Sequence, residues 1–144
     1  MRDTTNLTIE ALDPIRLPII KRLYQQHYKA GKPKKDELII TAQIDNQTVA
    51  VVRFRTIESF RLLTGMLVLP EYRGGEVGKA LLTHCRDHVL NTQDYCFAYS
   101  YLEEYYTGHG FTTMDKELLP ASLKALLLRY TSSGKDLIPM QFNG

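Results

Sequence analysis

Residues 66–90 read MLVLPEYRGGEVGKALLTHCRDHVL, a short apolar run followed by a glycine-rich turn and a pattern of helical period. The apolar run stops at Pro70, which predicts a buried strand. Three glycines fall within the five positions after Arg73, and from Val77 onward the apolar residues recur at helical spacing. The first turn of a helix has unpaired N–H groups and a partial positive charge, and glycines let an anion approach the backbone closely. This stretch therefore predicts a strand, a turn and a helix that together can hold an anion.

The whole chain has the length and composition of one ordinary globular domain. Its 144 residues predict a single domain over 1–144, and the net charge of +2 gives no reason to expect a nucleic-acid partner or a membrane. No apolar run approaches the roughly 20 residues of a membrane span. The polar start of the chain is not followed by a signal-peptide core. Cys85 and Cys96 both fall within apolar patterns, which predicts buried thiols in a reducing, cytoplasmic compartment.

The predicted elements alternate between strands and helices, which indicates an α/β fold with a mixed sheet. A strand over 7–12 precedes a turn at Asp13-Pro14, where Asp13 is a candidate N-cap with Pro14 at the first helical position; because of Pro18, the regular helix should begin near that residue. A three-strand meander over 37–69 leads into the central helix. The strand over 95–100 follows that helix, so it should run parallel to the strand before it. The remaining predicted elements are a helix over 102–107, a strand over 111–114, a helix over 120–131 and a strand over 136–142. Because Pro139 cannot donate to a ladder, the last strand is expected at an edge of the sheet.

The glycine turn matches neither of two common nucleotide-binding motifs. A P-loop requires Gly-x-x-x-x-Gly-Lys-Ser/Thr, but Arg73 stands at the first glycine position and Ala80 follows Lys79. The dinucleotide motif Gly-x-Gly-x-x-Gly does not fit either, and this turn follows a meander rather than a first strand. An ordinary turn before a helix is the simpler structural alternative.

A second motif and the order of the elements make the chain resemble the GCN5-related N-acetyltransferase (GNAT) superfamily. The central motif of that family, Val-x-Pro-x-x-Arg/Gln-x-x-Gly-x-Gly/Ala, is similar to residues Val68–Gly78, and its later signature, aromatic-Tyr-x-x-x-Gly-Phe, appears at Tyr105–Phe111. The resemblance covers about residues 7–111 by element order. It implies a single GNAT-like domain with an antiparallel N-terminal meander, a parallel strand pair splayed at the acyl-CoA site, and helices on both faces of the sheet.

The resemblance implies acetyl-CoA as a cosubstrate and no metal. The pantetheine arm would pair with the central strand, and the pyrophosphate would lie on amides at the start of the helix, with charge added by Arg73 and Lys79. The residues implied for binding acetyl-CoA are Met66, Leu67, Val68, Arg73, Gly74, Gly75, Glu76, Val77, Gly78 and Lys79. Glu76 departs from the family, which has glycine there. A carboxylate at that position repels a pyrophosphate unless it turns outward, and Gly74-Gly75 offers a shifted register for the turn.

The reaction implied is direct attack of a neutral primary amine on the thioester. An alkyl ammonium with a pKa near 10 must first lose a proton. A backbone N–H near Val68 can stabilise the oxyanion, and Tyr106 matches the family position of the general acid that protonates the CoA thiolate. The alternative for Tyr106 is a packed aromatic ring, although Tyr105 is the neighbour expected to pack inward. No general base stands out, because the strand over 60–69 has no acid; Glu58, Glu103, Glu104 or a water relay remain candidates.

Several questions stay open at the level of sequence. The acceptor is an amine-bearing small molecule or a peptide, and the assembly is either a monomer or a homodimer. A non-catalytic acyl-CoA-binding or regulatory domain is the main alternative function. His84 and His88 stand four apart on the central helix and therefore share one face of it. A metal site formed by these two histidines is a weaker alternative function, and the competing interpretation is that both histidines are structural. Arg53 and Arg55 share a face of the meander, where they either attract an acidic acceptor or are solvated.

Overall fold

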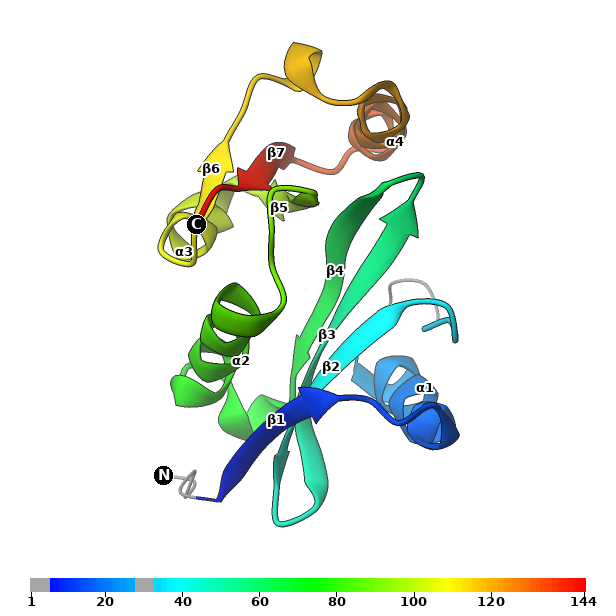
Figure 1. Ribbon diagram of the computed structural model, residues 1–144, viewed down its shortest axis with the longest axis vertical. Helices are drawn as coiled ribbons and strands as arrows, with labels where there is room; N and C mark the ends of the chain where they lie inside the picture. The colour runs from blue at the N-terminus through cyan, green and yellow to red at the C-terminus, as the bar shows by residue number, and fades with distance from the viewer. Residues whose placement is uncertain (1–5, 28–32) are drawn as a thin grey trace. The chain divides into compact units, whose positions relative to one another are not determined.

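The computed structural model describes residues 6–27 and 33–144, and within them the chain forms a seven-stranded mixed sheet with helices (Figure 1). The strands are β1 (Leu7–Ala11), β2 (Leu38–Ile44), β3 (Gln47–Ile57), β4 (Phe60–Val68), β5 (Asp94–Tyr99), β6 (Phe111–Thr113) and β7 (Leu137–Phe142). The α-helices are α1 (Leu17–His27), α2 (Glu76–His88), α3 (Glu103–Thr107) and α4 (Ala121–Ser132). Short 3-10 turns are η1 (Pro14–Arg16), η2 (Pro70–Tyr72), η3 (Ser100–Leu102) and η4 (Lys116–Leu118).

The hydrogen-bonded order of the sheet is β1-β2-β3-β4-β5-β7-β6. The strands β1, β2 and β3 are antiparallel neighbours, whereas β4 and β5 run parallel over Arg61–Leu63 and Asp94–Cys96. The sequence prediction of a mixed sheet with one parallel crossover pair is therefore confirmed. The chain divides into two compact units, one of residues up to Arg55 together with Thr64–Cys85, and one of Thr56–Leu63 together with Arg86–Gly144.

In the first unit, the entry into α1 follows from Asp13 and the proline after it. The Asp13 carboxylate accepts a hydrogen bond from the Ile15 amide at 3.1 Å, and Pro14 occupies the first position of η1. The regular helix begins at Leu17, so Pro18 falls in its first turn, where a missing N–H costs nothing. The helix buries Ile20 and Tyr24 in a cluster that also contains Ile39, Val51 and Leu67.

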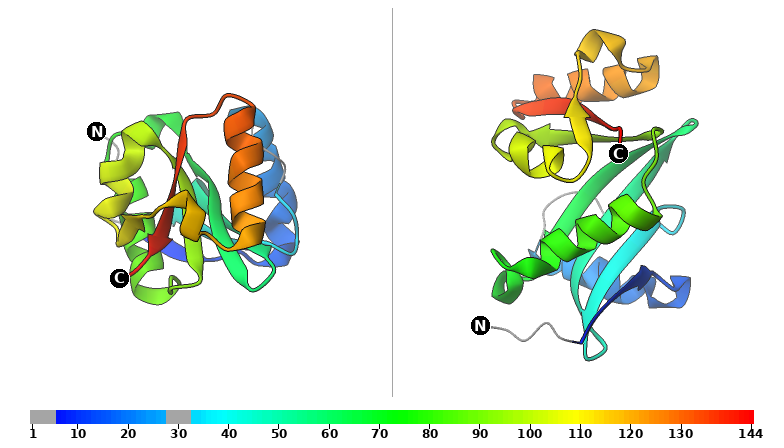
Figure 2. Two further views of the ribbon diagram at one scale, coloured as in Figure 1. Left: turned by 90° about the horizontal axis from the view of Figure 1, so that it is seen from above. Right: turned by 60° about the vertical axis from the view of Figure 1, so that its left-hand side comes forward.

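The helices α1 and α2 cover opposite faces of the strands β2 to β4 (Figure 1 and Figure 2). The helix α2 packs on the sheet through its apolar side, where Val77, Leu81 and Leu82 are each at most 1% exposed. Cys85 lies on the same buried side of α2, and Cys96 is buried on β5; both are free thiols, as the sequence predicts. Among the described helices, none combines the length and the apolar character that crossing a bilayer requires.

In the second unit, the expectation that the last strand lies at an edge of the sheet is wrong. β7 is not at an edge, because it pairs with β5 on one side and with β6 on the other. Pro139 is tolerated there because β6 ends at Thr113, one pair short of it. The Pro139 carbonyl accepts a hydrogen bond from the Met114 amide at 3.1 Å, so the missing proline N–H falls just beyond the end of the β6 ladder.

An ion pair joins the two parallel strands where they begin to pair. Asp94 is fully buried, and its two carboxylate oxygens accept hydrogen bonds from Arg61 at 2.7 Å each. The carboxylate also accepts a bond from the Asn91 amide at 2.8 Å, and Arg61 donates to the Val89 carbonyl at 2.8 Å. Because Arg61 and Asp94 are direct register partners, the pair fixes the alignment of β4 with β5.

Candidate functional site

The glycine turn between β4 and α2 has the backbone that an anion-binding turn needs. Gly74 adopts a left-handed conformation with φ +75°, and a Cβ built there would meet nothing within 4 Å. A Cβ at Gly75 would meet only the Tyr72 carbonyl oxygen, at an ordinary 3.5 Å. The helix α2 then begins at Glu76, so the first-turn amides that follow have no partner within the helix. The turn is thus open at its surface and ends in a helix N-terminus.

The Glu76 side chain is exposed at the first position of α2. An acidic side chain in the first turn interacts favourably with the helix dipole. Val77, next to it, is 1% exposed and anchors the start of the helix in the core, whereas Lys79 is exposed. The Glu76 side chain is therefore exposed to solvent, and the left-handed residue of the turn is Gly74.

A side-chain bond ties this turn to the end of β4. Arg73 Nε donates to the Val68 carbonyl at 3.0 Å. The Leu69 amide donates to the Val49 carbonyl of β3 at 2.9 Å, and backbone groups on successive strand residues point in opposite directions. The amide and carbonyl of Val68 therefore point away from β3. Arg73 was expected only to supply charge, and nothing in the sequence indicates its bond to Val68.

The second motif lies in the other unit, on α3 and the turn after it. The Tyr106 ring is 8% exposed and packs edge-on against Phe111 of β6, with ring centroids 6.0 Å apart. Tyr105 is 37% exposed, so the expectation that Tyr105 packs inward is wrong. The short α3 turns Tyr106 toward Phe111 and leaves Tyr105 on the open side, where partial burial still raises its pKa above the usual value. The glycine turn and Tyr106 belong to different compact units.

The turn after α3 contains His109 between Gly108 and Gly110. His109 is buried, and its Nδ1 lies 2.9 Å from the Tyr105 carbonyl oxygen. Gly110 has φ +94°, which non-glycine residues rarely adopt. The unusual backbone angle thus belongs to Gly110, and His109 is held as a structural side chain.

Other side chains that the sequence singled out as functional candidates take part in contacts within the fold. Arg53 is buried rather than solvated. Its charge is compensated within the fold, because one of its terminal nitrogens donates to both carboxylate oxygens of Glu37 at 3.0 Å. Its guanidinium also lies 4.9 Å from the centre of the Tyr24 ring. No group of three or more metal-ligating side chains occurs in residues 6–27 and 33–144. Of the acids considered as general bases, Glu103 accepts a hydrogen bond from the Thr113 hydroxyl.

Comparison with known proteins identifies the class to which this fold and these motifs belong. The family model described as an acetyltransferase (GNAT) domain matches residues 35–113, which is more than half of the chain. The chain therefore belongs to the GNAT family. No curated protein sequence matches the chain.

Solved structures with the same fold include acetyltransferases of known substrates. Arabidopsis thaliana Naa50 in complex with the bisubstrate analogue CoA-Ac-MVNAL has a TM-score of 0.67 and 16% identity, over 97% of this chain and 100% of that one. The ribosomal-protein-S18-alanine N-acetyltransferase from Escherichia coli has a TM-score of 0.64 and 16% identity, over 94% and 92% of the two chains. N-acetylglutamate synthase from Neisseria gonorrhoeae, complexed with coenzyme A and N-acetyl-glutamate, has a TM-score of 0.65 and 15% identity over 96% of this chain. This chain spans 35% of that synthase.

Proposed function

We propose that the protein transfers an acetyl group from acetyl-CoA to the primary amine of an amino acid, a peptide or another small molecule. The observation that carries this proposal is the open glycine turn at the start of α2, in a chain that belongs to the GNAT family. Two of the structures of similar fold are complexes, one with coenzyme A and N-acetyl-glutamate and the other with the bisubstrate analogue CoA-Ac-MVNAL. We take residues 1–144 to act as one GNAT domain.

The residues around the turn fit the cosubstrate. Gly74 and Gly75 leave space above the backbone, which a pyrophosphate needs to reach amides from Glu76 to Lys79. Arg73 and Lys79 are exposed cations beside those amides. The strand residues Met66 to Val68 would pair with the pantetheine arm through the backbone groups that point away from β3. Acetyl-CoA supplies the activated acetyl group, and this part of the chain binds and orients it.

The transfer forms one bond and breaks another. The neutral amine attacks the acetyl carbon, the new C–N bond forms, and the C–S bond of the thioester breaks. The Val68 N–H is the donor that we assign to the oxyanion, and Tyr106 gives its phenolic proton to the leaving thiolate. The proton of the amine passes to water, because residues 60–69 contain no acid that could take it, and Tyr106 regains a proton from water after CoA leaves.

A panel of amines, assayed for release of the CoA thiol, tests this proposal. Tyr106→Phe should lower kcat by about 10²- to 10⁴-fold, the usual contribution of a general acid, with little change in acetyl-CoA affinity. Tyr105→Phe is the matched control, since it removes a neighbouring hydroxyl on the exposed side of α3. Equal kcat in the two variants would remove Tyr106 from the chemistry. Binding of acetyl-CoA without thiol release for any amine would instead favour a binding-only domain, in which the carboxylate of Glu76 stands where the family has glycine.

A further inference from the structure

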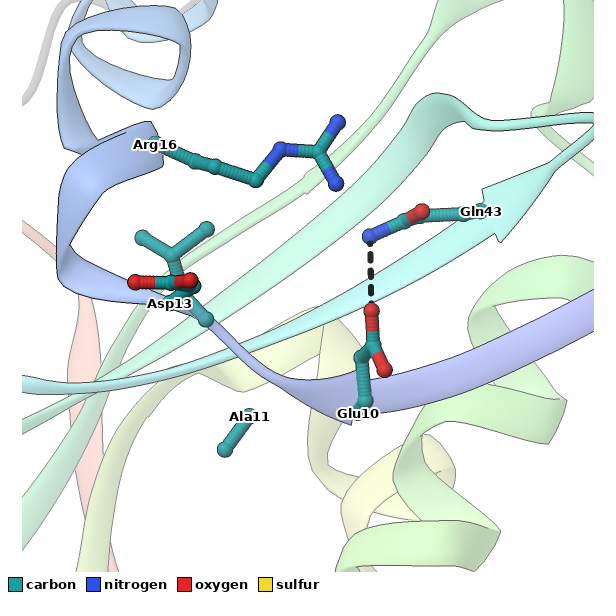
Figure 3. A pocket seen from close by; sticks show the side chains of 6 residues that line it. Glu10, Ala11, Asp13, Arg16 and Gln43 are labelled. Atoms are coloured by element: carbon teal, nitrogen blue, oxygen red, sulfur yellow. Dashed lines mark hydrogen bonds between the residues drawn. The ribbon is translucent and has the colours of Figure 1, made fainter.

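A polar cavity of about 320 Å³ lies in the first unit, beside the junction between β1 and η1 (Figure 3). Its lining residues are Glu10, Ala11, Leu12, Asp13, Arg16 and Gln43. The volume is at the lower end of the range of small-molecule sites, about 300–1,000 Å³. None of these residues belongs to the glycine turn or to α3, which carry the groups assigned to acetyl transfer.

The floor of the cavity is a fixed polar network on the face of the sheet that α1 covers. Gln43 is only 5% exposed, and its side-chain amide donates to Glu10 Oε1 and to the Thr41 hydroxyl, both at 3.3 Å. Glu10 and Thr41 are direct register partners in β1 and β2. Figure 3 shows Gln43 reaching across to Glu10. The buried amide therefore holds the Glu10 carboxylate at the edge of the cavity.

The opposite side of the cavity carries the guanidinium of Arg16, which has no side-chain or backbone partner among the described residues. The half-buried Arg16 side chain extends into the cavity (Figure 3). Across residues 6–27 and 33–144 its guanidinium forms no ion pair or hydrogen bond, although two carboxylates line the same cavity. Asp13 uses one oxygen to cap η1, through the Ile15 amide. A guanidinium with its fork of donors unused inside a cavity is suited to binding a ligand carboxylate.

From this arrangement we infer that the cavity binds a free amino acid, with its carboxylate on Arg16 and its ammonium between Glu10 and Asp13. The formal charge of the lining is −1, from two carboxylates and one guanidinium, so an amino acid with a basic side chain is the best match. The groups that this binding uses lie on β1, on η1 and at its N-cap, and on β2, and none of them is assigned to acetyl transfer. The bound amino acid is a ligand and is not acetylated there.

Titration with L-lysine, followed by two-dimensional amide NMR in the absence of CoA, tests the inference. Saturable shifts should be centred on residues 10–16 and 43. Nα-acetyl-L-lysine lacks the α-ammonium and L-lysinamide lacks the carboxylate, so each should bind at least about tenfold more weakly than L-lysine, because each loses a charge-assisted contact. Absence of saturable shifts, or equal binding of the three probes, would overturn the inference.

Variants of the lining residues separate a specific site from general charge effects. Arg16→Gln and Glu10→Gln should each weaken L-lysine binding at least about tenfold. Arg22→Gln, an exposed position of α1 outside the cavity, is the matched control and should leave binding unchanged. Asp13→Asn keeps a good N-cap while it removes a charge, so it should weaken binding without unfolding η1. Unchanged binding in Arg16→Gln would contradict the site, whatever the outcome of the acetyltransferase assays, because no CoA is present.

Discussion

The substitution Gly110→Ala tests how tightly the turn after α3 is packed. Gly110 has φ +94°, and a Cβ built on it would lie 2.6 Å from Cε1 of Phe142 and 3.1 Å from the carbonyl carbon of Gly144. Phe142 packs on Phe111 with ring centroids 5.5 Å apart, and Phe111 packs on Tyr106. The added methyl group must therefore displace a ring that supports the tyrosine assigned to proton transfer.

Two costs add in this variant. Holding a non-glycine residue in a sparsely populated backbone region costs about 1–3 kcal/mol. Forcing an extra methyl group into a packed site costs about 1–3 kcal/mol more. Gly134→Ala is the matched control, because Gly134 has φ +100° but a Cβ there would meet nothing within 4 Å. The control therefore measures the backbone cost alone, and the difference between the two variants measures the collision with Phe142.

Urea unfolding of the wild type and the two alanine variants measures the loss of unfolding free energy in each variant. The free energy of unfolding is the product of the transition midpoint and the m-value. Gly110→Ala should lose about 1–3 kcal/mol more than Gly134→Ala. A second check places Phe142→Leu in the Gly110→Ala background. There the Phe142→Leu substitution should lower the free energy of unfolding by less than it does in the wild type. Equal losses for the two alanine variants would refute the reasoning from the Phe142 contact.

Three further predictions concern other parts of the chain. Asp94→Asn removes the buried charge partner of Arg61 and should lower the free energy of unfolding by about 3 kcal/mol, measured by urea unfolding. Gly74→Ala, with its left-handed backbone, should lose about 1–2 kcal/mol in the same assay, whereas Gly75→Ala should be close to neutral. Burial raises the pKa of the Cys96 thiol above its ordinary value of 9.0, so the unfolded state ionises first as pH rises. The wild type should therefore lose stability relative to Cys96→Ala as the pH rises above about 9, and parallel Tm values from pH 8 to 10 would contradict this.

The main elements could be predicted because local sequence signals agreed with the fold. The alternation of apolar residues, the cap at Asp13 and the short apolar runs gave the strands and helices close to their observed bounds. The position of β7 could not be predicted, since whether Pro139 is tolerated depends on where β6 ends. Two buried ion pairs were also missed, because the sequence separation between Arg53 and Glu37, or between Arg61 and Asp94, carries no sign that they meet.

The candidate site could be predicted only as far as its motifs reach. The glycine turn was located from its residue types, and the left-handed backbone at Gly74 is a conformation that glycine adopts at low cost. Which of two adjacent tyrosines faces inward depends on the direction of a five-residue helix, and this could not be read from Tyr105-Tyr106. The amino-acid cavity was invisible as well, because the pairing of β1 with β2, and not spacing in the sequence, brings Gln43 to Glu10.

Isothermal titration calorimetry of acetyl-CoA tests the central claim, that the glycine turn at the start of α2 binds the acetyl donor. The wild type should bind acetyl-CoA. Gly78→Arg should bind at least about tenfold more weakly while keeping the Tm of a folded protein, because a long side chain in the first turn of α2 competes for the space of the pyrophosphate. Absence of binding to the wild type at millimolar acetyl-CoA, or equal affinity in the two proteins, would contradict the account.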